Sequence, residues 1–333
     1  MKVAVVGAGS WGTSVAALAA SNAPTVLWAR NPELTATMRQ LHENPEYLAG
    51  SPLPTSLTYT SDLAEACGDA EVVVLGVPSH GMRAVLERAA PLIAEQVPVV
   101  SLAKGVEQGT LLRMSEVAAE VLGRPERVAV LTGPNLAREV MAGQPAATVV
   151  ATPDPAIATR LQQLFMTKTF RVYTNPDVVG CEVAGALKNV IAIAAGIAAG
   201  LGYGDNTRAA LITRGLAELA RLGVALGGDP LTFAGLAGMG DLVATCISEQ
   251  SRNRTVGVEL GRGRPLHDVT SEMKMVAEGV KTTPAVLELA GRVGVEMPIA
   301  EQVGSVITQG RQPSDLVPAL MMREAKSELH GIT

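Results

Sequence analysis

The sequence predicts an α/β domain followed by an all-α domain, with the change near residue 180. Before that point, short apolar runs alternate with helical segments, which predicts a largely parallel, doubly wound sheet. After it, the apolar residues follow a helical period and the strand pattern almost disappears. A chain of 333 residues is long enough for two such domains. We therefore assign residues 1–178 to the first domain and residues 179–333 to the second.

The first thirty residues carry the strongest motif. An apolar strand at residues 3–6 runs into the sequence GAGSWG at residues 7–12, and an Ala-rich helix follows over residues 13–20. Gly7 permits the tight turn, Gly9 allows a ligand to approach the backbone, and Gly12 lets helix and strand pack closely. The N–H groups at the helix N-terminus favour a pyrophosphate. This context predicts a Rossmann-type dinucleotide-binding domain; the alternative is a tight turn without a ligand.

A second strand, at residues 25–29, ends at Arg30. An NAD-specific site of this type places an acidic residue near this position to bind the ribose 2′-hydroxyl. An arginine suits a 2′-phosphate instead, so we expect NADP to be the preferred cofactor and NAD to be used as well. The alternative is that Arg30 is an ordinary exposed arginine at a strand end.

Further strands are expected along the rest of the first domain. Their ranges are residues 71–77, 97–103, 128–131, 146–151 and 170–173. Polar loops follow three of them, at residues 78–80, 104–107 and 132–135. Because ligands of doubly wound sheets bind outside the carboxyl ends of the strands, these loops should line the cofactor cleft.

Helical periodicity dominates the second domain. The expected helices are residues 178–201, 206–226, 230–237, 252–261, 283–293 and 299–308, and residues 248–254 and 261–265 are expected to be loops. The first helix has the length of a membrane span, but Glu182, Lys188 and Asn189 would be costly near the middle of a bilayer. Its longest uncharged run, residues 189–203, is too short to span. We expect a buried central helix and no membrane-spanning segment.

Lys188 lies in this helix with apolar residues on all sides. Burial lowers the pKa of a lysine and makes it a usable general acid or base, although a lysine more commonly buries only its stem. Farther on, Asp241 and Thr245 share a face if a helix begins there; otherwise Asp241 is a simple helix cap. The run from Ser251 to Arg254 suits a phosphate clamp, and its alternative is a solvated loop arginine.

Composition excludes several classes of partner. The net charge is −5 with no basic run, which argues against nucleic-acid binding. Cys67, Cys181 and Cys246 form no C-x-x-C motif, which indicates free thiols in a reducing, cytoplasmic compartment. The four histidines have no metal-ligand spacing, so no metal is expected. The first strand begins almost at Met1, which leaves no room for a signal peptide. Aromatic residues are only 3% of the chain, so glycine and alanine should let helices pack closely.

Taken together, these motifs resemble one family, the bacterial NAD(P)-dependent glycerol-3-phosphate dehydrogenases. The matching segments are GAGSWG (7–12), SLAKG (101–105), TGPNLA (132–137), EVAGALKN (182–189), GLAGMGDL (235–242), SRNR (251–254) and EG (278–279). They occur in the family's order and cover the chain from residue 1 to about 320. The resemblance implies reversible reduction of dihydroxyacetone phosphate to sn-glycerol 3-phosphate, the backbone precursor of glycerophospholipids.

The resemblance also implies roles for individual residues. Lys188 would be the general acid and base. The substrate-binding residues would be Lys104, Gly133, Asn135, Asp241, Thr245, Ser251, Arg252 and Asn253. The cofactor-binding residues would be Gly7, Gly9, Ser10, Trp11, Gly12, Arg30, Lys104, Ala137, Arg252, Val276 and Glu278. Asn135 departs from the family, which more often has serine there, so that one contact is in doubt. We further expect a homodimer.

Two alternatives stay open from the sequence. One is a related dehydrogenase for a hydroxy acid or sugar acid, in which Arg252 and Asn253 would contact a carboxylate. The other is a dinucleotide-sensing module without catalysis. Such a module needs the glycine turn but has no use for a buried Lys188.

Overall fold

The computed structural model describes residues 1–273, 276–325 and 327–328, which fall into two compact units. The first unit comprises residues 1–104 and 112–178, and the second comprises residues 105–111 together with the chain from residue 179. The segment 105–111 departs from the expectation that residues 1–178 form one domain without interruption. Val106 and Leu111 belong to the apolar core of the second unit, and the Gln108 side chain donates to the Lys281 carbonyl at 2.9 Å.

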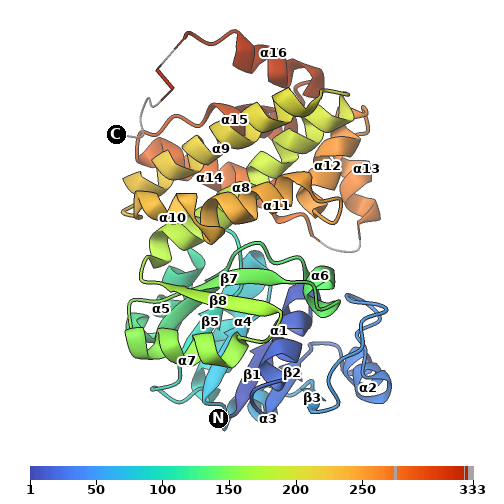
Figure 1. The fold of residues 1–333 in the computed structure, drawn as a ribbon, viewed down its shortest axis with the longest axis vertical. Coiled ribbons are helices and arrows are strands. Elements are labelled where there is room, and N and C mark those ends of the chain that lie inside the picture. Colours follow the sequence, from blue (N-terminus) through green and yellow to red (C-terminus); the bar gives the residue numbers. More distant parts are fainter. Residues whose placement is uncertain (274–275, 326, 329–333) are drawn as a thin grey trace. The chain divides into compact units, whose positions relative to one another are not determined.

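A single twisted sheet organises the first unit (Figure 1). Its strands in the described residues are β1 (Val3–Val6), β2 (Thr25–Trp28), β3 (Leu57–Thr60), β4 (Val72–Leu75), β5 (Val99–Ser101), β6 (Val128–Thr132), β7 (Ala146–Ala151) and β8 (Phe170–Asn175). Their order is β3-β2-β1-β4-β5-β6-β7-β8. Every neighbouring pair is parallel except β6 and β7, so the prediction of a largely parallel sheet is confirmed. The sequence analysis missed β3.

Helices cover both faces of this sheet. They are α1 (Ser10–Ala20), α2 (Pro32–Leu41), α3 (Leu63–Cys67), α4 (Met82–Ala89), α5 (Met114–Leu122), α6 (Ala137–Met141) and α7 (Pro155–Phe165). Successive strand residues face opposite sides. Val3 and Val5 therefore pack with α1 and α7 in one core, whereas Ala4 and Val6 pack with α3, α4 and α5 in another. The doubly wound prediction is confirmed.

The glycine turn between β1 and α1 has the tight geometry that its spacing predicts. Gly7 has φ +119°, and a Cβ there would lie 2.7 Å from the Gly76 carbonyl carbon. A Cβ on Gly12 would lie 2.1 Å from the Gly7 carbonyl oxygen, so neither position accepts a side chain. The helix begins at Ser10, three residues earlier than predicted, because Gly9 already serves as its N-cap.

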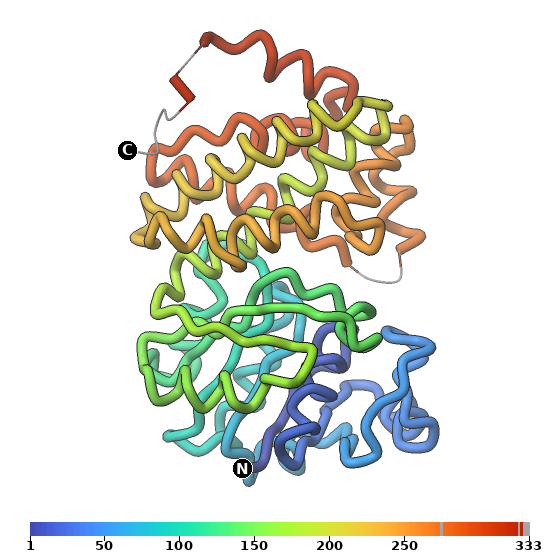
Figure 2. Tube along the Cα trace, viewed as in Figure 1, coloured from blue at the N-terminus to red at the C-terminus, as the bar shows by residue number. Residues whose placement is uncertain are grey.

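The described part of the second unit contains helices and no strands (Figure 2), as predicted. Its helices are α8 (Val178–Gly200), α9 (Asp205–Ala225), α10 (Pro230–Ala234), α11 (Asp241–Ile247), α12 (Arg252–Gly261), α13 (Leu266–Glu272), α14 (Glu278–Arg292), α15 (Pro298–Gln309) and α16 (Leu316–Met321). The expected helix 230–237 was wrong at its end: it stops at Ala234, and a π-helical turn, Leu236–Gly240, follows. Of the expected loop 248–254, only residues 248–251 are non-helical, because Ser251 caps α12. Helices α13 and α16 were not foreseen.

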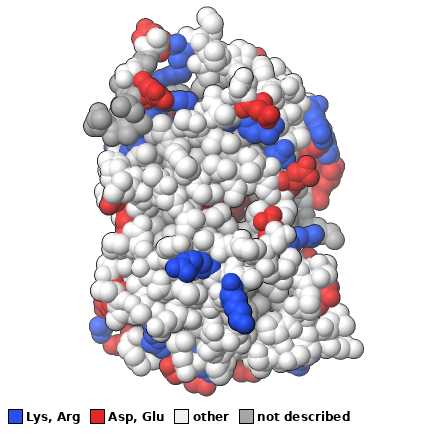
Figure 3. All heavy atoms as spheres, in the orientation of Figure 1, with Lys and Arg blue, Asp and Glu red and all other residues white. Residues whose placement is uncertain are grey.

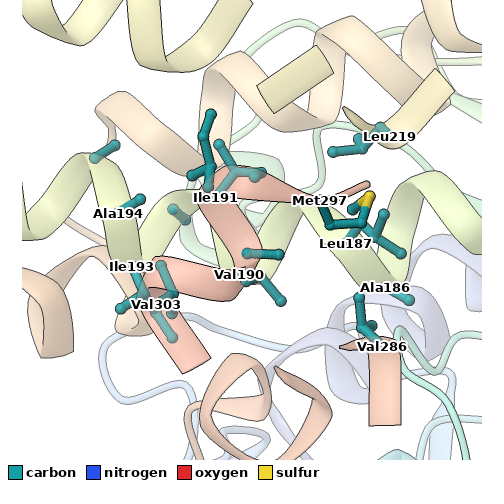
Figure 4. Close-up of a cluster of buried hydrophobic side chains, with 14 of the residues drawn as sticks. Ala186, Leu187, Val190, Ile191, Ile193, Ala194, Leu219, Val286, Met297 and Val303 are labelled. Atoms are coloured by element: carbon teal, nitrogen blue, oxygen red, sulfur yellow. The ribbon is translucent and has the colours of Figure 1, made fainter. Parts of the chain in front are cut away.

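Helix α8 is the core of the second unit. Leu187, Val190 and Ile193 on α8 pack with residues of other helices, among them Leu219, Val286 and Val303 (Figure 4). By length and composition alone α8 could cross a membrane, and it is the one such helix among the described residues. However, 89% of its apolar window is buried within the structure. Its apolar character is therefore explained by the core that surrounds it.

Glycines set the distance between α8 and α12. A Cβ on Gly196 would lie 2.9 Å from the Gly257 Cα, and a Cβ on Gly200 would lie 3.0 Å from the Gly261 Cα. Because both helices carry glycines four residues apart, their backbones touch over a full turn. This contact fixes α12 against the helix that carries Lys188.

Glu218 on α9 supports α15 from a buried position. Its carboxylate accepts from the backbone N–H groups of Ile299, at 2.7 Å, and Ala300, at 3.2 Å. Burial raises the pKa of Glu218 to about 7, and the two backbone hydrogen bonds oppose this rise. The carboxylate thus satisfies two N–H groups that the first turn of α15 would otherwise leave without partners.

This raised pKa predicts a pH-dependent stability. Between the ordinary pKa of a glutamate, 4.5, and the raised pKa of about 7, the folded protein binds more protons at Glu218 than the unfolded chain does. The contribution is therefore fully present below pH 4.5 and is lost as the pH rises to about 7, with a limit of roughly 3 kcal/mol. We expect the unfolding free energy of the wild type to fall relative to that of Glu218→Gln from pH 5 to pH 7.5. Urea denaturation at several pH values measures this difference. A difference that stays constant over this range would contradict the prediction.

Candidate functional site

The glycine turn of the first unit leaves room for a ligand at one point. A Cβ built on Gly9 would meet no atom within 4 Å, in contrast to Gly7 and Gly12. The Gly9 N–H makes no hydrogen bond among the described residues. It stands at the N-terminus of the 11-residue helix α1, where N–H groups and the helix dipole favour an anion. These features fit a pyrophosphate.

Arg30 follows β2 and is exposed, and no described residue forms a hydrogen bond or an ion pair with its guanidinium. The next residue, Asn31, caps α2 by accepting from the Glu33 N–H at 2.9 Å. A hydrogen bond to Glu46 raises the pKa of Tyr47, and the positive charge of Arg30 opposes this rise. Arg30 and Tyr47 are therefore close enough to interact electrostatically. An exposed guanidinium in this position is available to a 2′-phosphate.

Trp11 lies within the first turn of α1 and is partly buried. Its ring centroid is 6.1 Å from that of Phe170, and its indole N–H is buried without a hydrogen-bond partner in the described structure. Ala137, at the start of α6, lies beside α1 because the Ser14 hydroxyl approaches its carbonyl at 3.5 Å. Trp11 therefore lies on the helix that begins at the glycine turn, and Ala137 lies beside that helix.

Lys104 and the 132–135 loop meet at the ends of β5 and β6. The Lys104 ammonium donates to the Gly133 carbonyl at 3.0 Å, and the Asn135 amide donates to the Thr148 hydroxyl at 3.1 Å. Gly133 has φ +142°, and a Cβ there would lie 3.1 Å from the Thr148 Cα. The Thr132 hydroxyl and the Asn135 Oδ1 are buried and have no partner among the described residues. Unsatisfied polar atoms of this kind are consistent with a bound polar ligand.

In the second unit, Lys188 is buried and makes an ion pair with Asp241. Their exposures are 6% and 1%. The ammonium also donates to the Thr245 hydroxyl at 2.8 Å, and that hydroxyl donates in turn to the Asp241 carbonyl oxygen at 2.6 Å. Asp241 and Thr245 share one face of α11, as predicted, and Gly240 takes the cap position. The alternatives of a surface lysine and a capping aspartate were therefore wrong.

The ion pair changes the electrostatic argument for Lys188. Burial by itself favours the neutral amine, but a buried carboxylate in contact favours the ammonium. The pair is also hydrogen-bonded by a third side chain, Thr245, which fixes the direction of the N–H groups. This arrangement holds a proton on a buried nitrogen, as a general acid requires. Cys246 beside it stays a thiol, because burial raises its pKa to about 12.

A second network begins at Asn189, the residue after Lys188. The Asn253 amide donates to the Asn189 Oδ1 at 2.9 Å, and the Asn253 Oδ1 accepts from the Gly279 N–H at 2.9 Å. A Cβ on Gly279 would lie 2.8 Å from both the Asn189 carbonyl oxygen and the Asn253 Oδ1, so only glycine fits. This network joins α8, α12 and α14.

Arg252 and its neighbours complete the second-unit cluster. The exposed Arg252 donates to the Val276 carbonyl at 2.9 Å, and Glu278 lies in the first turn of α14. Ser251 caps α12 by accepting from the Arg254 N–H at 3.3 Å. The structure therefore gives Ser251 and Asn253 structural hydrogen bonds, and their contact with substrate stays a prediction.

The predicted residues thus form one group in each unit. The first-unit group is Gly7, Gly9, Ser10, Trp11, Gly12, Arg30, Lys104, Gly133, Asn135 and Ala137, and the second-unit group is Lys188, Asp241, Thr245, Ser251, Arg252, Asn253, Val276 and Glu278. Sequence reasoning missed Asn189 and Gly279 as parts of the second-unit network, and it missed Asn44, whose amide donates to the Ala8 carbonyl of the glycine turn at 2.8 Å. Asn189 was visible as a polar residue in an apolar helix, whereas Asn44 carries no recognisable motif.

The main cavity of the second unit lies apart from these groups. On the face shown in Figure 3, lysine and arginine side chains are scattered among acidic and uncharged ones. A cavity of about 1010 Å³ in the second unit is lined by α9, α15, α16 and the segment after it. None of the predicted site residues lines this cavity, so it does not mark the candidate site.

Comparisons with known proteins agree on one family. A family model described as NAD-dependent glycerol-3-phosphate dehydrogenase N-terminus matches residues 2–158, and the corresponding C-terminus model matches residues 177–318. A protein of Sphingopyxis alaskensis named as an NAD(P)+ glycerol-3-phosphate dehydrogenase is 54% identical over 331 residues, which cover 99% of each chain. A protein of the same name from Thermobifida fusca is 53% identical over 334 residues, again covering 99% of each.

A solved structure supports the same relationship. The crystal structure of glycerol-3-phosphate dehydrogenase from Coxiella burnetii matches with a TM-score of 0.92 and 37% sequence identity. The match covers 97% of this chain and 99% of that one. The likeness therefore extends over both units.

Proposed function

Because the chain belongs to the NAD-dependent glycerol-3-phosphate dehydrogenase family over nearly its whole length, we propose that it reversibly reduces dihydroxyacetone phosphate to sn-glycerol 3-phosphate with NADPH or NADH. The observation that carries this proposal is the buried Lys188, bonded to Asp241 and Thr245. A sensing module has no use for a buried ammonium poised in this way. The product would supply glycerophospholipid synthesis.

The residues present in the first unit fit a nicotinamide dinucleotide. Gly9 and the N-terminus of α1 would hold the pyrophosphate, Arg30 would contact a 2′-phosphate, and Trp11 and Ala137 would lie beside the bound molecule. The reduced nicotinamide supplies the hydride that C2 of the ketone receives. We also assign Lys104, Arg252, Val276 and Glu278 to cofactor contacts on the family resemblance.

Lys188 would supply the proton for the reduction. As C2 becomes tetrahedral, negative charge develops on its oxygen, and the Lys188 ammonium transfers a proton to that oxygen. Asp241 holds the lysine in the ammonium form beforehand, and Thr245 fixes the direction of its N–H groups. In the reverse direction, the neutral amine takes the hydroxyl proton. Water restores the original protonation state after each turnover.

The substrate phosphate would be bound by Arg252 together with Asn253, with Ser251, Lys104, Gly133 and Asn135 as further substrate contacts. Arg252 is exposed and uses one N–H on the Val276 carbonyl, which orients the rest of its guanidinium. Binding energy from the phosphate would hold C2 in place and so increase the rate. Asn253 is itself held by Asn189 and Gly279.

Cofactor preference provides a prediction for the first unit. We expect NADPH to have the higher kcat/KM, and Arg30→Ala to lower the value for NADPH about 10-fold while changing that for NADH little. This is the lower end of the range for a charge-assisted hydrogen bond, because Arg30 is exposed and screened by salt. Steady-state kinetics with both cofactors measure the effect. Arg171→Ala, an exposed arginine on β8, is the control, and equal losses for both cofactors would contradict the assignment.

Two other functions are separated by one experiment. A dehydrogenase for a hydroxy acid would reduce a 2-oxo acid and not dihydroxyacetone phosphate, and a dinucleotide sensor would reduce neither. We expect the protein to oxidise NADPH with dihydroxyacetone phosphate and not with a 2-oxo acid. The absorbance of the nicotinamide band measures this oxidation. No turnover of dihydroxyacetone phosphate would refute the proposed function.

We also propose that the protein is a cytoplasmic homodimer. Cys67, Cys181 and Cys246 are buried and form no disulfide in the described structure, which suits a reducing compartment. The dimer is proposed from the sequence analysis alone. Light scattering of the purified protein tests it, and a monomer mass at micromolar concentration would contradict it.

A further inference from the structure

We propose that Asn44 is a positioning residue for dinucleotide binding, acting through the carbonyl of Ala8 in the glycine turn. The inference rests on the proposed function, because it needs a dinucleotide at residues 7–12. Asn44 lies in the connection between α2 and β3, thirty-six residues from Ala8 in sequence. It would aim the glycine turn at the ligand without touching the ligand.

The connection that carries Asn44 is a closed loop with a fixed position. The Leu53 N–H donates to the His42 carbonyl at 2.7 Å, which joins the two ends of the loop. The Gly50 N–H donates to the Glu43 side chain at 2.8 Å, and Leu48 is fully buried in the loop. Hydrogen bonds and a buried leucine therefore hold the loop that carries Asn44 in place.

Both the nitrogen and the oxygen of the Asn44 side-chain amide form hydrogen bonds within the first unit. Its exposure is 0%, its Nδ2 donates to the Ala8 carbonyl at 2.8 Å and to the Thr13 hydroxyl at 2.9 Å, and its Oδ1 accepts from the Tyr47 N–H at 3.1 Å. Ala8 precedes the N-cap of α1 and Thr13 lies in its first turns. The amide therefore ties the loop to both the turn and the helix. An aspartate could not replace it, because a carboxylate donates no hydrogen bond.

The bond to Ala8 determines where the next N–H points. In a trans peptide the C=O and the following N–H point in opposite directions, and the described structure contains no cis peptide bond. Because Asn44 holds the Ala8 carbonyl on one side, the Gly9 N–H is directed to the other. That N–H has no hydrogen-bond partner in the described chain, and a Cβ built on Gly9 would meet no atom within 4 Å. Asn44 therefore aims a free donor at the place where the pyrophosphate is proposed to bind.

A second bond from the same loop strengthens this argument. The Ser10 hydroxyl donates to the Tyr47 carbonyl at 2.6 Å, so the loop contacts the glycine turn on both sides of Gly9. Rotation of the Ala8–Gly9 peptide would break the Asn44 bond, and movement of the helix start would break the Ser10 bond. The loop thus preorganises the turn, which lowers the ordering cost of binding.

The experiment measures binding of NADPH and NADH to the purified protein by isothermal titration calorimetry. We expect Asn44→Ala to raise the Kd of both cofactors by about 10-fold and by the same factor, because the pyrophosphate is common to both. At saturating cofactor, kcat should stay within about 2-fold of the wild type, since the loss is in binding. Thr13→Val removes one partner of the same amide with little change of shape, and a smaller rise of both Kd values is expected.

Asn22 offers a matched control in the same unit. Its Nδ2 likewise makes two hydrogen bonds, to the carbonyls of Leu164 and Met166, both at 2.9 Å, although Asn22 is exposed. Asn22→Ala should therefore lower stability without changing either Kd. The inference is overturned by unchanged Kd values in both Asn44→Ala and Thr13→Val, by a loss confined to NADPH, or by an equal loss in Asn22→Ala. Binding is measured without substrate, so failure of the wild type to reduce dihydroxyacetone phosphate would refute the proposed reaction and leave this inference standing.

Discussion

Replacing Lys188 by alanine should lower kcat by about 10²- to 10⁴-fold, the usual contribution of a positioned general acid. Affinity for NADPH should stay near the wild-type value, because we assign Lys188 to the substrate oxygen and not to the dinucleotide. Steady-state kinetics with dihydroxyacetone phosphate, together with calorimetric titration of NADPH, measure the two effects separately.

Removal of Lys188 also leaves Asp241 buried without its partner, which destabilises a protein by about 3–5 kcal/mol. For this reason we would add Asp241→Asn to the same chain, so that no buried carboxylate is left uncompensated. Lys281→Ala, an exposed lysine on α14, is the control and should keep full activity. A folded Lys188→Ala protein with near-normal kcat would show that the lysine is structural.

Replacing Arg252 by alanine should lower kcat/KM for dihydroxyacetone phosphate by at least about 100-fold. A guanidinium that binds phosphate with two parallel hydrogen bonds loses two charge-assisted contacts, each of roughly 1.5–3 kcal/mol. Dihydroxyacetone, which lacks the phosphate, should be a poor substrate for the wild type, and Arg252→Ala should change its turnover little when the cofactor is saturating. Kinetics with the two ketones measure this difference.

Arg262 serves as the control for this variant. It lies at the other end of α12, is exposed, and pairs with Glu259 at 2.8 Å. Arg262→Ala should keep the wild-type kcat/KM. If Arg252→Ala reduced the turnover of both ketones equally at saturating cofactor, the contact with the Val276 carbonyl would be its main role and the phosphate would be bound elsewhere.

The amino-acid sequence by itself determined the parts of this protein that depend on local backbone geometry. Gly7 and Gly12 stand where any Cβ would collide with neighbouring backbone, so their spacing after a strand specifies the turn and the fold around it. The apolar run of α8 likewise identified a core helix, and a single lysine within it was a recognisable anomaly. Asp241 and Thr245 could be placed on one face because helical spacing is regular.

Only the tertiary structure decided which of these residues meet. Lys188 and Asp241 are 53 residues apart, and Asn189 and Asn253 are 64 apart, so no local pattern pairs them. Their meeting depends on how closely the helices approach. For Asn189 and Asn253, glycine contacts between α8 and α12 set that distance. The pairing also changes the conclusion about the charge of Lys188. Burial alone would favour the neutral amine, whereas the carboxylate of Asp241 favours the ammonium.

The same reason explains the elements that sequence reasoning missed. The segment 105–111 joins the second unit through Val106 and Leu111. Which apolar core these two residues pack in depends on the tertiary structure and not on their local sequence. Asn44 is one polar residue in a long connection, and its importance comes from the Ala8 carbonyl that the fold brings to it. Periodicity and spacing specify which elements form, whereas hydrogen bonds between distant side chains exist only after those elements have packed.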